Sequence, residues 1–386
     1  MNLIEEKAWK RLKRNRSAVF GGLVILLASL LAIFAYHIAP DQTPSANDQI
    51  LQLETHPPGF SIEVLKIRRQ KELADEGGFF SGWGGFHSSY QPVPVLKYSF
   101  SGDSMTFLEY RGKGFAPLRQ TLSIHQVVYA EDRKYVPPAE QLKMHQEIKQ
   151  RLIERRTYWL GTDKFGRDIL SRLLIGIRIS LSVGFVSVFI SLILGITAGA
   201  LAGYFRGWID QTVNWVMNVF WAIPTILLAM CLYISAGNWI ENKLLLIFIA
   251  VGLTMWVDVA RIVRGQFLLV TELEYITAAR SLGFSHFRTI FKHVLPNTLA
   301  PVIVVACANF ANAILVESGL SYIGLGIQPP APSWGSMLNE YKGFIDTDKA
   351  YLALFPGLAI MFMVLAFNLI GNGLRDALDV KGKTES

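Results

Sequence analysis

The chain has 386 residues, 51% of them hydrophobic and 17% charged, and a formal net charge of +7. A mean hydropathy of +0.33 at this charge content predicts apolar blocks that alternate with polar ones. No basic patch interleaved with aromatic residues indicates a nucleic-acid partner, and the only two cysteines, Cys231 and Cys307, both lie in apolar segments, which excludes a disulfide or metal framework.

Six apolar segments are long enough to cross a hydrocarbon core of roughly 30 Å, which takes about 20 residues of helix. They are Ser17–Ala39, Ile179–Gly203, Val213–Ile234, Leu244–Val263, Thr298–Ser318 and Tyr351–Ile370. The first has a basic flank like that of a signal peptide, but its apolar run exceeds the 7–15 residues of a signal core. The sequence therefore predicts an all-α polytopic membrane protein whose first uncleaved span lies within residues 1–39.

Positive charge concentrates in three short flanks of these spans: before the first, between the fourth and fifth, and after the sixth. The flanks carry Lys7, Lys10, Arg11, Lys13, Arg14, Arg16, Arg264, Arg280, Arg288, Lys292, Arg375, Lys381 and Lys383. Short loops rich in Lys and Arg remain in the cytoplasm. We therefore expect an inner-membrane protein with both termini in the cytoplasm, the tail comprising residues 374–386.

Residues 40–176 form a long, mostly polar insertion between the first two spans, which this topology places outside the cytoplasm. "VLKYSFSGDSMTFLEYRG" has two β-rich runs around a Ser-Gly-Asp turn and predicts a hairpin. Leu142, His145, Ile148 and Leu152 recur at helical spacing and predict an amphipathic helix over Ala139–Arg156. The glycine- and aromatic-rich centre, "EGGFFSGWGGFHSSYQPVPV", is typical of irregular structure. We expect a small α+β insertion, either a spacer or capping element or a binding module.

Small and polar residues interrupt the predicted helical core. Gly195, Gly199 and Gly203 stand four apart on one helix face, a spacing that lets helix backbones approach closely in a membrane. Prolines within the third and fifth spans, Pro224 and Pro301, are expected to kink them. Three polar residues of the fifth span, Asn309, Asn312 and Glu317, are candidates either for interhelical hydrogen bonds or for lining a pathway. Glu317 is also a candidate for the outer interface.

Motifs of several enzyme classes are absent. The sequence has no G-x-x-x-x-G-K-[ST] phosphate loop, no H-E-x-x-H metal motif and no G-x-S-x-G nucleophile elbow, and its seven histidines form no ligand cluster. The two aspartates of "GTDKFGRD" fit a turn in which Asp168 caps a helix better than they fit a metal loop. We expect no catalytic residue, no metal site and no bound cofactor.

The connection between the fourth and fifth spans, residues 271–296, is too polar to cross a bilayer yet strongly patterned. Two helical faces follow one another along it, formed by Tyr275, Ala278, Ala279 and Leu282 and then by Phe287, Ile290, Phe291 and Val294. Gly283 can adopt a positive φ to end the first helix, and Ser285 can cap the second. The pattern predicts a helix–turn–helix on the cytoplasmic face, either resting on lipid or docking into a partner.

The spacing of Ala278, Ala279 and Gly283, followed by Leu-Pro at Pro296, resembles the "EAA" loop of binding-protein-dependent ABC importer permeases. Other segments resemble the dipeptide/oligopeptide/nickel branch of that family, and specifically its second, C-type permease subunit. They are "LGTDKFGRDILSRLLIGIRISLSVG", "LAGYFRGWID", "WAIPTILLA", "EYITAARSLG", "HVLPN" and "ESGLSYIGLGIQPPAPSWGSML". The resemblance is loose over Met1–Ala39 and strong over Leu160–Asp379.

The resemblance implies an ABC transmembrane type-1 domain over residues 177–373, forming half of a pathway for di- or oligopeptides or related solutes. It implies as partners a homologous second permease, two cytoplasmic ATPase subunits that hold ATP and Mg²⁺, and an external solute-binding protein. The loop would contact the ATPase through Glu274, Tyr275, Thr277, Ala278, Ala279, Gly283, Phe284, Ser285 and Pro296. Thr277 stands where the family has the motif glutamate, so the ATPase contact of that carboxylate is either lost or moved to Glu274.

Two other classes of protein fit parts of the pattern. A membrane scaffold or sensor would bind a ligand with the external insertion and recruit a non-ATPase partner. A carrier driven by an ion gradient would show an inverted repeat and ionisable groups at mid-membrane; the sequence shows no convincing repeat, and its charges cluster near span ends.

Overall fold

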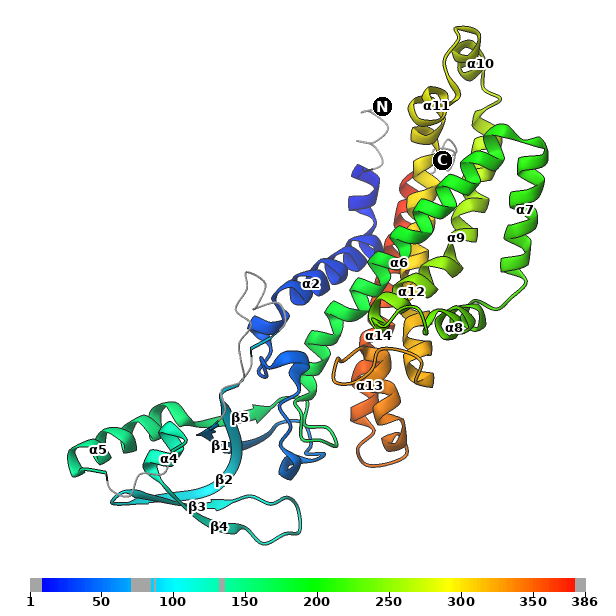
Figure 1. The fold of residues 1–386 in the computed structure, drawn as a ribbon. Helices are drawn as coiled ribbons and strands as arrows, with labels where there is room; N and C mark the ends of the chain where they lie inside the picture. Colours follow the sequence, from blue (N-terminus) through cyan, green and yellow to red (C-terminus); the bar gives the residue numbers. More distant parts are fainter. Residues whose placement is uncertain (1–8, 71–84, 87, 132–135, 379–386) are drawn as a thin grey trace. The chain divides into compact units, whose positions relative to one another are not determined.

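The computed structural model describes residues 9–70, 85–86, 88–131 and 136–378. The chain divides into two compact units (Figure 1). We call the first the helical unit; it comprises Met1–Ile33, Gly176–Gly343 and Ala353–Ser386. The second, the mixed unit, comprises Phe34–Ile175 and the short segment Phe344–Leu352. Three long helices, α2 (Arg16–Ile38), α6 (Ile169–Phe205) and α14 (Tyr351–Leu378), begin in one unit and end in the other.

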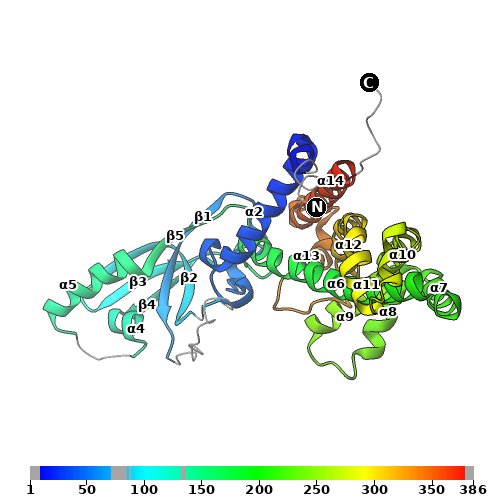
Figure 2. The same ribbon diagram turned by 90° about the horizontal axis from the view of Figure 1, so that it is seen from above.

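Helices make up the helical unit, and Figure 2 looks down several of them. They are α2 (Arg16–Ile38), α6 (Ile169–Phe205), α7 (Gly207–Trp221), α8 (Thr225–Ala236), α9 (Lys243–Val270), α10 (Glu274–Ser281), α11 (His286–Thr289), α12 (Leu295–Ile323), α13 (Trp334–Tyr341) and α14 (Tyr351–Leu378). A π turn, Ile290–Val294, joins α11 to α12. Within the described residues, 5 helices are long and apolar enough to cross a membrane, or 6 if a bent pair counts as one span.

The third predicted span is not a single helix. The segment Val213–Ile234 falls on α7 and α8, which are bent by 94° at the short break between them. Pro224 stands at this break as the N-cap of α8. Proline has no backbone N–H to continue the ladder of hydrogen bonds, and its ring clashes with the preceding turn. The expected kink is therefore a complete break, whereas Pro301 lies inside α12.

Close contact between α6 and α9 depends on residues without side chains. A Cβ added at Gly199 would lie 2.5 Å from the carbonyl oxygen of Ala260 and 2.8 Å from the Cβ of Val263. Gly195 and Gly203 meet α9 in the same way, one helical turn on either side. Since any side chain at these positions would push the helices apart, the glycine stripe sets their spacing.

The basic flanks of the helical unit converge on one end. At this end Gly373 of α14 packs against Ala18 near the start of α2. Arg375 lines a cavity of about 520 Å³ together with Ile262 of α9 and Ala300 of α12. The start of α2, the end of α14 and the ends of α9 and α12 that lead into α10 and α11 therefore lie together.

A five-stranded antiparallel sheet forms the centre of the mixed unit, with strand order β4-β3-β2-β1-β5. The strands are β1 (Phe60–Arg68), β2 (Tyr90–Ser101), β3 (Ser104–Glu109), β4 (Leu118–Ser123) and β5 (Ile153–Tyr158). Two helices, α4 (Ile124–Tyr129) and α5 (Pro138–Glu147), cover one face, where Leu65, Val95 and Phe107 form a core. The other face packs Ile62, Val64 and Tyr158 against residues of the Leu51–Leu53 turn and its neighbour Ile50.

The structure confirms the predicted hairpin, since β2 and β3 pair from Ser101 and Ser104 outward. The predicted helix over Ala139–Arg156 is wrong at its C-terminal end. It ends at Glu147, passes through a π turn at Ile148–Leu152 and continues as β5. Pairing of β5 with β1 overrides the local helical pattern. Leu142, assigned to the buried face, is 68% exposed. Half of the segment expected to be irregular, residues 76–95, lies outside the described residues, and the expectation is wrong at its C-terminal end, where residues 90–95 belong to β2.

A buried ion cluster stabilises the turn before α6. The carboxylate of Asp163 accepts hydrogen bonds from Nε of Arg167 at 2.7 Å and from the backbone N–H of Phe165 at 2.8 Å. Nε of Arg172 lies 3.9 Å from the same carboxylate, and all three ionic side chains are buried. As predicted, Asp168 caps α6, accepting from the backbone N–H of Ser171 at 2.9 Å. Burial raises the pKa of Asp168.

Candidate functional site

The predicted helix–turn–helix is present as α10 and α11 with the π turn that follows, and we call residues 274–294 the hairpin. Gly283 has a φ of +80°, which lets the N–H of Phe284 reach the carbonyl of Ala279 at 3.2 Å. The N–H of Gly283 itself reaches Arg280 at 3.0 Å, and the two bonds complete a Schellman motif. The hydroxyl of Ser285 accepts from the N–H of Arg288, which caps α11.

The hairpin presents large apolar side chains to the surface. Leu282 is 75% exposed, Phe287 72% and Phe291 54%, and the rings of Phe287 and Phe291 lie 4.4 Å apart. We call these three residues the apolar tip. The inward side is formed by Ile276, Ala279 and Val294, which are buried. Of the two faces expected from the sequence, therefore, only Ala279, Val294 and in part Ile290 turn inward.

Aromatic and amide contacts attach the hairpin to the long helices. Tyr204 near the end of α6 places its hydroxyl 3.0 Å from Nδ1 of His286, and the guanidinium of Arg280 lies over its ring at 4.8 Å. Nδ2 of Asn297 at the start of α12 donates to the hydroxyl of Tyr275 at 3.1 Å. The hairpin is thus held against α6 and against the start of α12. The sequence does not reveal the Tyr204–His286 contact because the two residues are 82 positions apart. The Tyr275–Asn297 contact joins residues 22 positions apart and is not apparent from a local pattern either.

A second set of polar contacts attaches the α6–α7 corner to the base of the hairpin. Arg206, with a φ of +55°, reaches Glu272 at 3.1 Å and the hydroxyl of Thr271 at 3.3 Å. One turn further on, Asp210 of α7 pairs in bidentate fashion with Arg264 of α9 at 2.5 and 2.7 Å. A bidentate arginine–carboxylate pair fixes orientation as well as distance, so α7 and α9 are held in register.

The remaining residues predicted in the loop lie mostly at its surface. Glu274, Thr277, Ala278, Ser285 and Pro296 are exposed. Glu274 is the first residue of α10, where its negative charge favours the helix dipole. The half-buried ring of Phe284 stacks on His293 and lies under the guanidinium of Arg288. Pro296 occupies the first turn of α12, which needs no N–H there.

The structure does not bring the three polar residues of the fifth span together. Asn309 is buried, and its amide donates to the carbonyl of Met255 in α9 at 3.3 Å, an interhelical hydrogen bond. Asn312 is exposed. Glu317 is fully buried, and its carboxylate accepts from the hydroxyl of Ser321 at 2.8 Å. None of the three lines the 520 Å³ cavity of the helical unit.

Over the described parts of the chain, no group of three or more His, Cys, Asp or Glu side chains is placed to hold a metal ion. What the hairpin offers chemically is therefore an exposed apolar surface with cationic groups near it.

Comparison with known proteins identifies the chain's relatives. The family described as "Binding-protein-dependent transport system inner membrane component" matches residues 195–381. A second, described as "N-terminal TM domain of oligopeptide transport permease C", matches residues 6–58. Among solved structures, the chain is similar to an inward-facing form of the MetNI methionine ABC transporter, with a TM-score of 0.45, 20% identity and coverage of 53% of this chain and 95% of that chain.

Two curated relatives are similar over the helical part. The dipeptide transport system permease protein DppC of Alkalihalophilus pseudofirmus is 44% identical over 227 residues, 59% of this chain and 73% of the relative. The glutathione transport system permease protein GsiD of Pectobacterium atrosepticum is 42% identical over 227 residues, 59% of this chain and 74% of the relative. These matches support the permease over a membrane scaffold. The chain belongs to the family of binding-protein-dependent transport system inner membrane components and is a C-type permease subunit of an ABC importer.

Proposed function

We propose that the hairpin is the coupling element of the importer and docks into a groove of a partner ATPase subunit. The observation that carries this proposal is the apolar tip. Leu282, Phe287 and Phe291 are exposed although the backbone beneath them is fixed by a Schellman motif and a helix cap. Large apolar side chains exposed on an ordered element are typical of an interaction site. Arg280, Arg288 and Lys292 near the tip add positive charge for an acidic rim.

The arrangement of the helical unit supports a topology in which this end faces the cytoplasm. The start of α2, the end of α14 and the hairpin lie together and carry the positive charge of the short flanks. Under the positive-inside rule both termini are then cytoplasmic, and residues 40–176 are extracytoplasmic. The full importer contains a homologous second permease, two ATPase subunits that bind ATP and Mg²⁺, and an external solute-binding protein.

We further propose that the solute is a short peptide or a peptide-like molecule. The relatives named for their solutes transport dipeptides and glutathione, and the second matching family is named for oligopeptide transport. This chain would contribute half of the pathway, and the glycine-packed pair α6–α9 would move as one body within it.

Movement of the docked hairpin has two defined routes into the helices. The Tyr204–His286 contact leads into α6, and the Tyr275–Asn297 contact leads into α12. An ATPase can drive the transition only if its two states contact the hairpin differently. Rigid-body rotation of α6 with α9, and of α12, then changes which side of the membrane has access to the pathway.

The test of docking replaces the most exposed residue of the apolar tip. Leu282→Glu is expected to leave folding intact, because the side chain is 75% exposed. It places a charge in the proposed interface, where an unpaired buried charge costs several kcal/mol. We expect the ATPase subunits recovered with the tagged chain, and peptide uptake, to fall at least about 10-fold. Leu142→Glu, at 68% exposure in the mixed unit, is the matched control. Equal recovery of ATPase with both variants would refute docking by this surface.

A second variant pair tests whether the shape of the turn matters. Gly283→Asn keeps a residue that tolerates a positive φ, whereas Gly283→Val introduces a β-branched side chain that does not. No atom lies within 4 Å of an added Cβ, so the pair differs in backbone strain and not in crowding. We expect Gly283→Val to hydrolyse ATP in the assembled importer but to lose most uptake. Gly283→Asn should retain uptake, and similar uptake by both variants would show that the turn does not transmit movement.

A further inference from the structure

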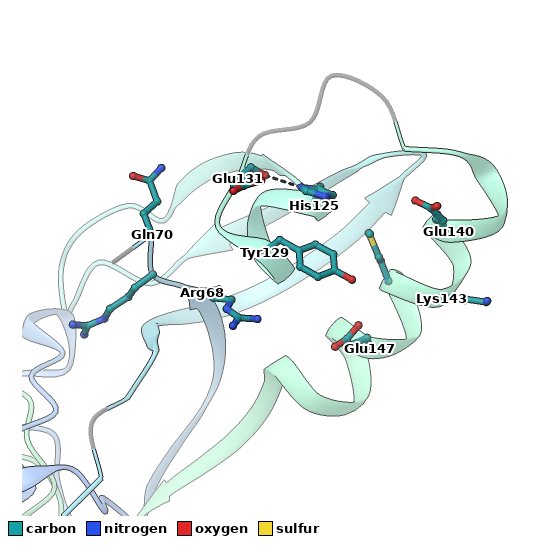
Figure 3. Close-up of a pocket in the computed structure, with 10 residues that line it drawn as sticks. Arg68, Gln70, His125, Tyr129, Glu131, Glu140, Lys143 and Glu147 are labelled. Carbon is teal, nitrogen blue, oxygen red and sulfur yellow. Dashed lines mark hydrogen bonds between the residues drawn. The ribbon is translucent and has the colours of Figure 1, made fainter. Parts of the chain in front are cut away.

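A groove in the mixed unit belongs to no part of the coupling machinery. Its volume is about 830 Å³, within the range of roughly 300–1,000 Å³ typical of small-molecule sites. It lies between the end of β1 and the two helices α4 and α5 (Figure 3). The residues that line it are Arg68, Arg69, Gln70, His125, Tyr129, Glu131, Glu140, Lys143, Met144 and Glu147.

The floor of the groove is aromatic and apolar. The rings of His125 and Tyr129 lie 4.8 Å apart on one face of α4, and a ring nitrogen of His125 lies 2.9 Å from the carbonyl oxygen of Glu131. This hydrogen bond fixes the ring. Tyr129 points across the groove toward α5, and Met144 is buried beneath. Such a floor accepts the side chains or the backbone plane of a bound molecule.

The walls carry opposite charges in equal number. Arg68 and Arg69 come from the end of β1, whereas Glu140, Lys143 and Glu147 recur at helical spacing on one face of α5. With Glu131 the groove holds three cationic and three anionic side chains. Lys143 and Glu147 make no ion pair with any residue that the structure describes. Both charges are therefore unpaired within the described chain, and Figure 3 shows Lys143 extending outward from α5, away from Tyr129.

We propose that this groove binds a short peptide with free termini. Arginine pairs with a carboxylate through two parallel N–H···O hydrogen bonds, so the β1 wall suits the C-terminal carboxylate. Glu147 suits the terminal ammonium, and the His125–Tyr129 floor suits the residue between. A groove of zero net charge with both signs on its walls selects a zwitterion over a simple anion or cation. The inference rests on the proposed function for its solute class, and it gives the insertion the role of an accessory peptide site.

The test measures retention of peptides by the assembled importer in lipid nanodiscs. The probe is an equimolar library of tripeptides with free termini, compared with the same library after N-acetylation and C-amidation. We expect the free library to be retained and the blocked library to be lost. Glu147→Gln, which preserves shape, and Arg68→Ala should each weaken retention about 10-fold. Arg151→Ala, an exposed residue outside the groove, is the control and should bind as the unsubstituted protein does.

Each other result contradicts the proposal. Equal retention of blocked and free peptides, or unchanged retention by Glu147→Gln, would show that termini are not recognised in this groove. If Glu147→Gln or Arg68→Ala lost the solute-binding protein from the complex but retained peptides unchanged, the groove would be a protein-docking surface instead. If the groove variants retained peptides normally while Leu282→Glu still lost uptake, the peptide site would be refuted and the proposed function would not.

Discussion

Replacing Asp163 with asparagine is expected to destabilise the mixed unit by about 3–5 kcal/mol. The carboxylate lies among the guanidinium groups of Arg167 and Arg172, and all three side chains are buried. Removing one partner of a buried ion cluster leaves cations in a medium of low dielectric without their counter-charge. The amide can still accept the backbone hydrogen bond from Phe165, so the expected loss is electrostatic.

Thermal denaturation of the purified chain in detergent measures this effect, with fluorescence of the mixed unit as the signal. Asp348→Asn provides the matched control, because Asp348 belongs to the same unit and is exposed. Surface substitutions of this kind change stability by about 0.5 kcal/mol or less. Similar denaturation midpoints for the two variants would mean that the cluster is solvated and does not stabilise the turn before α6.

Replacing Gly199 with alanine is expected to destabilise the helical unit by about 1–3 kcal/mol, the typical cost of overpacking. The new methyl group would lie 2.5 Å from the carbonyl oxygen of Ala260, a backbone atom that cannot rotate away. Helices α6 and α9 would have to separate along the whole glycine stripe. The separation would also lengthen the Asp210–Arg264 pair that connects α7 to α9.

Gly265→Ala is the control because the chemical change is identical and the surroundings differ. Gly265 also lies in α9, but no atom outside its own helix is within 4 Å of an added Cβ. Alanine in an unobstructed helical position gains about 0.5–1 kcal/mol over glycine. The two variants should therefore move the midpoint of SDS-induced unfolding in opposite directions. A stabilising effect at both positions would show that α6 and α9 are not in close contact.

The sequence predicts well those features that depend on local pattern. Hydropathy locates the long helices, because a membrane requires an apolar run of fixed length. Gly283 and Ser285 identify the turn of the hairpin, since few residues adopt a positive φ or cap a helix. The β2–β3 hairpin follows from alternating residues around a tight turn. Each of these signals lies within a short window of the chain.

Features that depend on distant partners are beyond such reasoning. The segment Ile153–Tyr158 has a helical pattern in sequence but is a strand, because it pairs with β1 some 90 residues earlier. The 94° break at Pro224 exceeds the kink that proline alone implies. Of the proposed coupling site, the loop residues could be named from sequence, whereas the anchors Tyr204 and Asn297 could not. Their contacts appear only when the ends of α6, α9 and α12 are brought together.

The mixed unit consists of two separate pieces of chain, and the smaller one is the segment Phe344–Leu352 before and at the start of α14. Nζ of Lys349 hydrogen-bonds the hydroxyl of Thr55 at 2.8 Å, and the hydroxyl of Tyr351 donates to the carbonyl of His56 at 2.9 Å. Residues 40–176 are therefore not a self-contained cassette. A graft of the insertion into a shorter permease, or its deletion from this one, must exchange both pieces together, and the two would have to change in concert during evolution.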